Sequence, residues 1–426
     1  MRDLKNLIKR TIIIFFLNLG CIFNSPVIVA FAIYLSLFKS KNIKYNDNYR
    51  KTAIIIYRAN GIDDVESAFQ YYQSKNRILF LERIYLRKIN SFFTQEDKIT
   101  IHQYLKNKRN QKYFIFLGKF VKWLRFFLGN IYFVSFNFAF SEEFNLRDVC
   151  FEKKISYLLM YKECVRTKGN YNLTFKKKYK NAINLNKNIL KISVYNNDMK
   201  KELIKNNIFN KSQIYVTGMP RSYYSQIKER EIIKQNIVFF LISNRAGLPV
   251  DRNLLPKKIQ DLSWSDINEK VLQVFGELSE KYPMINFIVK SKAGLSKKDQ
   301  DKIKNNIKSP NIKFYLGGAG HPLIKSSFII IAFNSTTVYE AILNEKKVII
   351  PYFKKYKNKI YRDYILEYPN KLCVENKKEL TKKIEATINT RKLINIKINK
   401  KEKKLIKKYL GNIKLAPKNM RKFLNI

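Results

Sequence analysis

Short apolar runs alternate with amphipathic stretches along most of this chain, and this alternation limits the possible folds more than any other feature. The clearest example is FIIIAFNSTTVYEAILNEKKVIIPYF, Phe328 to Phe353, in which two apolar runs flank a hydroxyl-rich turn and a short amphipathic stretch. Such a pattern is typical of a strand–helix–strand unit, whose two strands are parallel. The sequence therefore predicts an α/β fold.

The alternation starts twice. The first start is Thr52 to Gln73, which reads as a strand, a turn containing Gly61 and a helix opened by Asp63. Further strands are predicted in the first half at Arg77–Leu81, Tyr132–Phe136, Tyr157–Tyr161, Lys191–Tyr195 and Gln213–Thr217. The second half repeats the pattern with predicted strands at Asn236–Ser243, Asn286–Lys290, Ile312–Leu316, Phe328–Ala332 and Lys347–Pro351. We expect two α/β domains with parallel sheets, residues 46–221 and 236–396, joined by a polar linker, 222–235, and followed by a basic helical tail, 397–426.

The charge of the chain restricts its partners. It has 83 Lys and Arg against 33 Asp and Glu, a net charge of +50, but the basic residues are spread along the whole chain. No helix-turn-helix, aromatic RNA-binding motif or zinc spacing accompanies them, so we expect no nucleic acid partner and favour an anionic lipid surface. The cysteines Cys21, Cys150, Cys164 and Cys373 are far apart, which indicates neither a disulfide framework nor a metal site.

The N-terminus is a candidate membrane segment. Thr11 to Phe38 contains no charged residue over 28 positions, which is long enough to cross a bilayer. Basic residues lie on both sides, so the orientation stays open, and Asn24-Ser25-Pro26 offers a break for a re-entrant alternative. Residues 1–45 are therefore predicted to be a spanning or re-entrant anchor. A second stretch, Lys119 to Leu128, alternates cations with Phe120, Trp123, Leu124 and Phe127; it is either an interfacial helix or a core helix with solvated cations.

Polar residues follow the predicted strands of the second half, and parallel sheets bind ligands outside the carboxyl ends of their strands. Cations, a glycine loop, hydroxyls and a carboxylate converge there: Arg245, Lys290, Lys292, Gly318, His321, Ser335, Thr336, Thr337 and Glu340. This set suits a nucleoside diphosphate, because cations and helix N–H groups bind phosphate and a carboxylate can accept from a ribose hydroxyl. The plainer alternative is that Ser335 caps a helix and the cations are solvated.

At this point the sequence resembles a known family. VTGMPR, HPLI and NSTTVYEAILNEKKVIIPYF are similar to the two-Rossmann-domain (GT-B type) glycosyltransferases, in the branch of the CDP-glycerol glycerophosphotransferases. RANGIDDVESA and LMYKECVRTKG resemble bacterial surface-carbohydrate biosynthesis proteins, so that the resemblance spans Thr52 to Tyr352. It implies two Rossmann-like domains that face a cleft. It also implies that Ser335, Thr336, Thr337 and Glu340 hold the nucleotide diphosphate and ribose.

The resemblance implies a transferase at the cytoplasmic face of a bacterial inner membrane. No carboxylate motif of the DxD kind stands out at the end of a predicted strand, which agrees with a metal-independent mechanism, and no cofactor is expected. The donor of this transferase would be a nucleotide-activated sugar or CDP-glycerol, and its acceptor a lipid-linked or surface glycan. The family's His-Pro after the strand ending Lys290-Ser291-Lys292 and its His-Gly in the first domain are missing, which argues against teichoic-type polymerisation. Two alternatives stay open: a nucleotide-sugar 2-epimerase of the same fold, and a non-enzymatic basic membrane-binding or nucleic-acid-binding protein.

An inverting transferase needs a general base for the acceptor hydroxyl. The acidic candidates in the first domain are Asp63, Asp64, Glu66 and Glu163, of which Asp63 and Glu163 are favoured, and His321 is a further candidate. Each also has a structural interpretation, since Asp63 could be an N-cap, Glu163 could pair with Lys162 or Arg166, and His321 could have a purely structural role beside Pro322.

Overall fold

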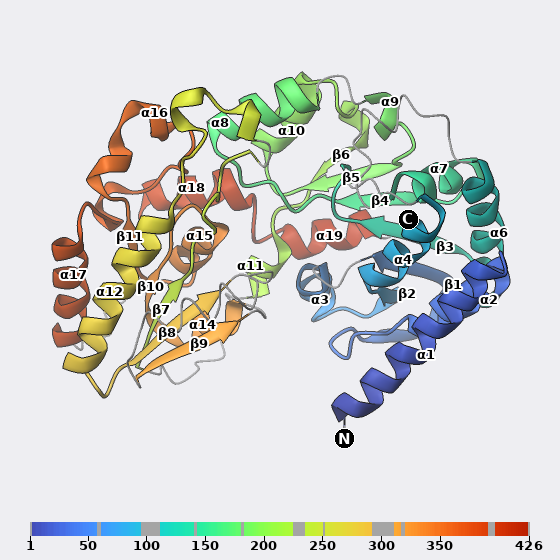
Figure 1. Cartoon of the computed structure of the whole chain (residues 1–426), viewed down its shortest axis with the longest axis horizontal. Coiled ribbons are helices and arrows are strands. Elements are labelled where there is room, and N and C mark those ends of the chain that lie inside the picture. The colour runs from blue at the N-terminus through green and yellow to red at the C-terminus, as the bar shows by residue number, and fades with distance from the viewer. Residues whose placement is uncertain are drawn as a thin grey trace. The chain divides into compact units, whose positions relative to one another are not determined.

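A computed structural model gives the fold (Figure 1). It describes the chain except residues 1, 58–60, 95–110, 140–142, 180–182, 225–234, 250–251, 292–310, 317–319, 391–396 and 425–426. The described α-helices are α1 (Arg2–Ile22), α2 (Pro26–Ser36), α3 (Ile62–Phe69), α4 (Arg83–Thr94), α6 (Gln111–Leu128), α7 (Phe144–Glu152), α8 (Lys168–Asn170), α9 (Ile183–Asn186), α10 (Asn197–Lys205), α11 (Pro220–Tyr224), α12 (Ser265–Lys281), α14 (His321–Lys325), α15 (Thr336–Leu343), α16 (Lys359–Arg362), α17 (Lys377–Thr390), α18 (Lys400–Leu410) and α19 (Ala416–Leu424).

The chain forms two compact units, each built around a six-stranded parallel sheet. The strands of the first unit are β1 (Tyr45–Tyr57), β2 (Ser74–Leu81), β3 (Ile131–Ser135), β4 (Tyr157–Met160), β5 (Lys191–Val194) and β6 (Ile214–Val216). Their order in the sheet is β2-β1-β3-β4-β5-β6. Ile54, Ile55 and Ile56 of β1 are all buried, as expected for a parallel strand covered on both faces. The strand order reverses at β1 and β3, which makes the carboxyl ends of these strands the switch point of the sheet.

The second unit has the Rossmann strand order. Its strands are β7 (Asn236–Phe240), β8 (Asn286–Ser291), β9 (Ile312–Leu316), β10 (Ser327–Ile331), β11 (Lys347–Pro351) and β12 (Cys373–Val374). The sheet runs β12-β11-β10-β7-β8-β9, with parallel pairing throughout. The chain starts in the middle at β7, moves outward to β9 and returns to β10 on the other side. The switch point therefore lies between β7 and β10.

The strands predicted from the sequence are present in both units, so the prediction of two Rossmann-like α/β domains is confirmed at this level. The strand predicted at Asn236–Ser243 ends early, at Phe240, because the backbone of Ile242 bonds to the side chain of Asn268 instead of to a neighbouring strand. Asn268 Oδ1 accepts from Ile242 N at 3.0 Å, and Asn268 Nδ2 donates to Ile242 O at 2.8 Å. The prediction that Asp63 opens the first helix is wrong. Gly61 is the N-cap of α3, and a Cβ there would lie 1.7 Å from the ring of Phe136.

Both units are discontinuous in sequence. The first contains Met1–Cys164, Asn181–Arg221 and Asn412–Ile426, and the second contains Val165–Lys180 and Ser222–Gly411. The basic C-terminal stretch is helical, and it divides between the units at Gly411. Helix α19 lies beside α3 (Figure 1), and its Met420, Phe423 and Leu424 belong to the same core cluster as Val65 and Phe69.

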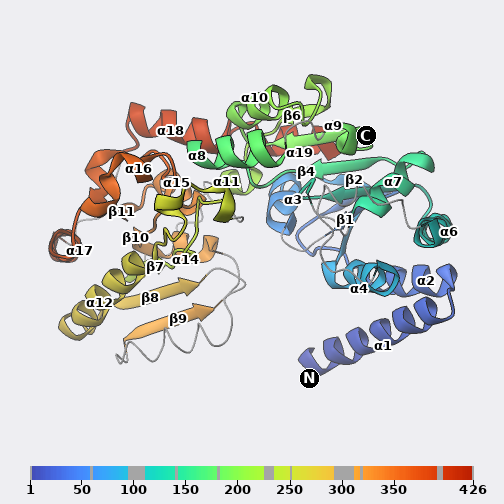
Figure 2. The same cartoon turned by 45° about the horizontal axis from the view of Figure 1, so that its top comes forward.

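The apolar N-terminal segment forms two helices. α1 ends at Ile22, Asn24 adopts a left-handed backbone with φ 48°, and Pro26 is the first residue of α2, as the Asn-Ser-Pro break predicted. α1 packs on α2 and α4, and α2 packs on α6 (Figure 2). Within the described part of the chain, no helix is both long enough and apolar enough to cross a membrane.

Helix α6 divides the side chains of the Lys119–Leu128 stretch between core and surface. Phe120 and Leu124 are fully buried, so the core interpretation holds for these two residues. Trp123 is 40% exposed and Phe126 is 76% exposed, beside the exposed cations of the same helix. The core interpretation thus holds for one face of the helix, and the interfacial interpretation of the exposed face stays a prediction.

Candidate functional site

Asn334 organises the switch point of the second unit. It follows β10 with a left-handed backbone, φ 50°, which asparagine tolerates better than most residues. Its side-chain amide donates to the carbonyl of Ala246 at 2.9 Å and to the carbonyl of Tyr364 at 2.8 Å, while its Oδ1 accepts from the N–H of Leu366 at 2.9 Å. One buried amide thus connects the loop after β7 to the loop after β10, which are the two loops that diverge at the switch point.

A segment from the first half of the chain completes this junction. Gly247 has φ +78°, and its carbonyl accepts from the hydroxyl of Thr167 at 2.9 Å and from the amide of Asn170 at 3.3 Å. The N–H of Gly169 donates to the carbonyl of Asp363 at 2.6 Å. The second half of the LMYKECVRTKG motif is therefore part of the second unit, where it supports the loops at the switch point.

Helix α15 begins directly after Asn334. Ser335 is its N-cap: the hydroxyl accepts from the N–H of Thr337 at 3.3 Å, as the capping interpretation predicted, and donates to the Thr337 hydroxyl at 3.1 Å. Ser335, Thr336 and Thr337 are each half-buried. A capped helix start with hydroxyls beside it, at the carboxyl end of a parallel strand, has the geometry that binds phosphate.

Glu340 lies one turn further along α15 and pairs with His321. The carboxylate Oε2 is 3.6 Å from His321 Nε2, and both side chains are largely buried. The other ring nitrogen of His321, Nδ1, is buried and has no hydrogen-bond partner among the described residues. His321 begins α14 after Gly320, where a Cβ would lie 3.1 Å from the ring of Phe240 at the end of β7. The structure thus brings together two predicted site residues that lie 19 positions apart in the sequence, on two helices with β10 between them.

Two predicted donor-binding cations lie at the same rim. Lys290, near the end of β8, is buried, and its Nζ donates to the carbonyl of Ser291 at 2.7 Å. Burial lowers the pKa of Lys290. Arg245, in the loop after β7, donates to the carbonyls of Gln260 at 3.0 Å and Pro249 at 3.3 Å, and burial lowers its pKa as well. Neither cation is a freely solvated surface charge, and Arg245 has a structural role within its loop.

Two other predicted residues, Lys292 and Gly318, lie outside the described residues.

The favoured bases of the first unit are on its surface. Asp63 is exposed on the first turn of α3, and its backbone carbonyl accepts from the hydroxyl of Ser67 at 2.5 Å. Glu163 is exposed after β4, and its carboxylate accepts from the amide of Asn137 at 3.3 Å. Lys162 pairs with Asp64. Glu66 accepts from the hydroxyl of Ser40 and, at 2.9 Å, from the amide of Asn42, so it ties α3 to the segment after α2.

Asp64 is the acidic residue of the first unit that the fold places at its centre. It is fully buried, with Oδ2 2.9 Å from Lys162 Nζ and 3.2 Å from Arg221 Nη1, and it also accepts from the Tyr195 hydroxyl at 3.1 Å. Burial alone would raise the pKa of Asp64, but the charges of Lys162 and Arg221 outweigh burial and hold that pKa well below its usual range. Because Lys162 and Arg221 stabilise its charged form, Asp64 is a weaker general base than an exposed carboxylate.

The role of Asp64 was missed because Asp63 and Asp64 look alike in the sequence. The available signal was that parallel sheets gather functional side chains at the carboxyl ends of their strands, which holds for the first half of the chain as well as for the second. Lys162, Tyr195 and Arg221 follow the ends of β4, β5 and β6, as Asp64 follows β1. The Asp64 cluster thus connects the carboxyl ends of four parallel strands. It carries one negative and two positive charges, which leaves the rim of the first unit with a net positive cluster.

Among the described residues, no group of three or more His, Cys, Asp or Glu side chains is placed to hold a metal ion. Metal independence stays a prediction.

No protein-family model matches the chain, and no curated protein matches it. Solved structures do resemble it. A UDP-GlcNAc 2-epimerase from Neisseria meningitidis bound to UDP-GlcNAc is 13% identical, with a TM-score of 0.47 over 88% of this chain and 99% of that one. The wall teichoic acid polymerase TagF is 8% identical, with a TM-score of 0.45 over 94% and 93%. An α,α-trehalose-phosphate synthase (UDP-forming) from Burkholderia vietnamiensis is 7% identical, with a TM-score of 0.44 over 88% and 100%. At these identities and TM-scores no conclusion about this chain is drawn from the likeness, and the assignment of two Rossmann-like units rests on the strand orders of the two sheets.

Proposed function

We propose that this protein is a membrane-associated transferase that moves a sugar or a polyol phosphate from a nucleotide-activated donor to a lipid-linked or surface glycan. The observation that supports the proposal best is the β7–β10 switch point, where Asn334 fixes the start of α15 and the His321–Glu340 pair lies one turn away. Its helix N-terminus suits a diphosphate and its buried carboxylate suits a ribose hydroxyl. We place the enzyme at the cytoplasmic face of a bacterial inner membrane.

In this proposal the second unit binds the donor. The hydroxyls of Ser335 and Thr336 and the N–H groups of the first turn of α15 hold the diphosphate, and the buried charge of Lys290 lies at the same rim. A cation that the fold keeps buried at a cost in desolvation is a typical member of a binding site. When the bond between the transferred group and the nucleotide breaks, these fixed groups would stabilise the negative charge that develops on the departing nucleotide.

The base is proposed to come from the first unit. Glu163 and Asp63 are exposed at the carboxyl-end rim and are open to an acceptor hydroxyl, whereas Asp64 is held by two cations. Glu163→Gln should lower kcat and leave the donor affinity unchanged, since the amide has the size of the carboxylate but cannot take a proton. Asp63→Asn is the matched comparison, and whichever variant lowers kcat identifies the base. A pair of variants that both keep full kcat would exclude both residues.

The donor site is tested by calorimetry with UDP-sugars and CDP-glycerol. Ser335→Ala combined with Thr336→Ala removes two donors to a charged group, at about 1.5–3 kcal/mol each, so the affinity should fall about 100-fold or more. Ser335→Gly with Thr336→Ala separates binding from capping, because glycine at an N-cap costs a few tenths of a kcal/mol. Thr381→Ala with Thr387→Ala is the control, since these two hydroxyls donate to carbonyls within α17. Unchanged affinity in both Ser335 variants would reject the donor site.

The reaction is tested with radiolabelled nucleotide sugars and CDP-glycerol, with and without lipid extract. Transfer of label to the lipid fraction supports the proposed transferase. Inversion at C2 of a nucleotide sugar without any acceptor would replace the transferase by the epimerase alternative, in which the same donor site is used.

A further inference from the structure

One side of α6 carries apolar and basic side chains together. Ile115, Trp123 and Phe126 are 58%, 40% and 76% exposed, and Lys112, Lys119 and Lys122 are exposed on the same helix. Residues three, four or seven positions apart share a face of a helix, so these six side chains form one stripe along α6. We call this stripe the α6 face. Its composition, large apolar groups among cations, differs from the mixed charges of an ordinary solvated helix.

Helix α2 continues the aromatic part of the α6 face. The ring of Phe127 lies 6.0 Å from the ring of Phe31 and 5.6 Å from that of Tyr34, both on α2. Trp123 and Phe126 lie 6.5 Å and 5.7 Å from the same Phe127 ring. Tyr34 and Trp123 are each 40% exposed. Tyrosine and tryptophan are enriched where protein meets the headgroup level of a bilayer, because one end of each ring is apolar and the other is polar.

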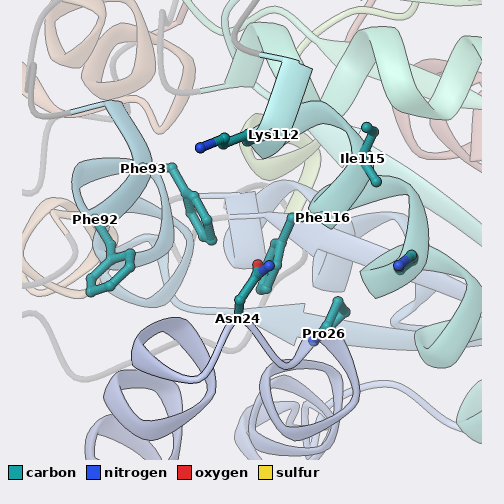
Figure 3. Close-up of a pocket in the computed structure, with 8 residues that line it drawn as sticks. Asn24, Pro26, Phe92, Phe93, Lys112, Ile115 and Phe116 are labelled. Atoms are coloured by element: carbon teal, nitrogen blue, oxygen red, sulfur yellow. The ribbon is translucent and has the colours of Figure 1, made fainter.

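The other end of the α6 face borders a pocket of about 500 Å³ that is lined by both apolar and polar side chains. Phe92 and Phe93 of α4 and Ile115 and Phe116 of α6 line it, together with Asn24 of the turn after α1 and Pro26 at the start of α2 (Figure 3). The rings of Phe93 and Phe116 are 4.5 Å apart. Lys112 and Lys119, which also line the pocket, are two helical turns apart, or about 10 Å along the axis. The pocket therefore combines aromatic and aliphatic side chains with two lysines of one helix.

The charge distribution favours an anionic partner. Neither α2 nor α6 contains an acidic residue, and the whole chain carries +50. A second copy of this chain is a poor partner, because a symmetric contact would place the three lysines of the α6 face against themselves. A bilayer with anionic phospholipids satisfies both parts of the face, since acyl chains receive the aromatic rings and phosphates receive the cations.

We propose that the α6 face docks in the plane of an anionic bilayer, and that the adjoining pocket takes one acyl chain of a phospholipid whose phosphate lies between Lys112 and Lys119. The inference deepens the proposed function by naming its membrane partner. It depends on residues of the first unit alone, so an experiment can disprove the membrane contact of the α6 face without affecting the proposed donor site of the second unit.

The first test is co-flotation of the full chain with vesicles of phosphatidylcholine, with and without phosphatidylglycerol. Each neutralised cation at an anionic surface should weaken binding about fivefold, so Lys112→Gln, Lys119→Gln and Lys122→Gln together should weaken it roughly 100-fold. The matched control neutralises three exposed lysines of α18, Lys403, Lys404 and Lys407, and should float like the unchanged chain. Equal binding to neutral vesicles, or a triple α6 variant that floats like the control, overturns the proposal.

The second test uses Trp123 as a depth probe. Its emission should shift to the blue with anionic vesicles and should be quenched by phospholipids brominated on their acyl chains. The other tryptophan, Trp264, is fully buried in the second unit, so Trp123→Phe should abolish both responses and leave a signal that vesicles do not alter. If the vesicles alter the emission of Trp123→Phe as much as that of the unchanged chain, the bilayer does not meet the α6 face.

The pocket is tested by native mass spectrometry with phosphatidylglycerol. One bound phospholipid is expected per chain, and Ile115→Glu should remove it because a carboxylate then occupies the place of the phosphate. Met284→Glu is the control, since Met284 is 79% exposed on the second unit. Retention of the lipid by Ile115→Glu overturns the pocket assignment. Calorimetry with nucleotides should show unchanged affinity in all of these variants, so a loss of vesicle binding is separate from a loss of the donor site.

Discussion

Asp64→Asn should destabilise the first unit and leave the second unchanged. The carboxylate is fully buried between Lys162 Nζ at 2.9 Å and Arg221 Nη1 at 3.2 Å. Without its charge the two cations face each other uncompensated, and loss of one partner of a buried ion pair costs about 3–5 kcal/mol. For a unit of this size each kcal/mol lowers Tm by about 2–4 °C, so the expected decrease is roughly 6–20 °C.

The two tryptophans separate the units in this measurement, because Trp123 belongs to the first and Trp264 to the second. Thermal unfolding followed by fluorescence in a Trp264→Phe background reports the first unit, and a Trp123→Phe background reports the second. Asp63→Asn is the matched control: its side chain is exposed one residue away, and the change should stay within about 0.5 kcal/mol.

The pH dependence gives an independent check. Because Lys162 and Arg221 outweigh burial and lower the pKa of Asp64, the stabilisation from its charge is complete above the unfolded value of about 3.9 and is lost as the pH falls through the lower folded value. The difference in Tm between the unchanged chain and Asp64→Asn should therefore shrink below about pH 4. Equal Tm values for Asp64→Asn and Asp63→Asn at pH 7 would refute this account of the cluster.

Three further changes test the second unit. Gly247→Ala should lower the stability of the second unit by more than about 1 kcal/mol, because φ is +78° and the new Cβ would lie 2.6 Å from Asn334 Nδ2. Thermal unfolding followed by Trp264 fluorescence measures this loss, and an unchanged midpoint would contradict it. Lys290→Met should weaken nucleotide binding in calorimetry and leave Tm unchanged or raise it, since burial lowers the pKa of Lys290 and a neutral side chain avoids the cost of desolvating a charge. A lower Tm with unchanged nucleotide affinity would give Lys290 a structural role instead. Glu340→Gln should weaken UDP binding more than binding of 2′-deoxy-UDP, and equal losses would remove Glu340 from a ribose site.

The strands of both sheets were predictable because each is an apolar run bounded by turn residues. The hydrophobic effect favours burying such a run inside a sheet, whatever the other elements of the fold are. β12 was missed because its two residues, Cys373 and Val374, are too few to show a pattern. Its pairing with β11 depends on the neighbouring strand and not on its own sequence.

The site was predictable where it follows local chain order and unpredictable where it depends on packing. Ser335 follows a strand and begins a helix, so its capping role could be read directly. The pairing of His321 with Glu340 joins two helices, and the choice of Asp64 over Asp63 depends on which side of α3 faces the core. Neither follows from residue type or spacing, because both need the three-dimensional positions of other elements.

The placement of α19 sets an order of events during synthesis. Met420, Phe423 and Leu424 complete the core around Val65 and Phe69, and they follow the second unit in chain order. Residues of the second unit up to Gly411 emerge before them. We therefore expect the core of the first unit to be completed only after the second unit has been synthesised.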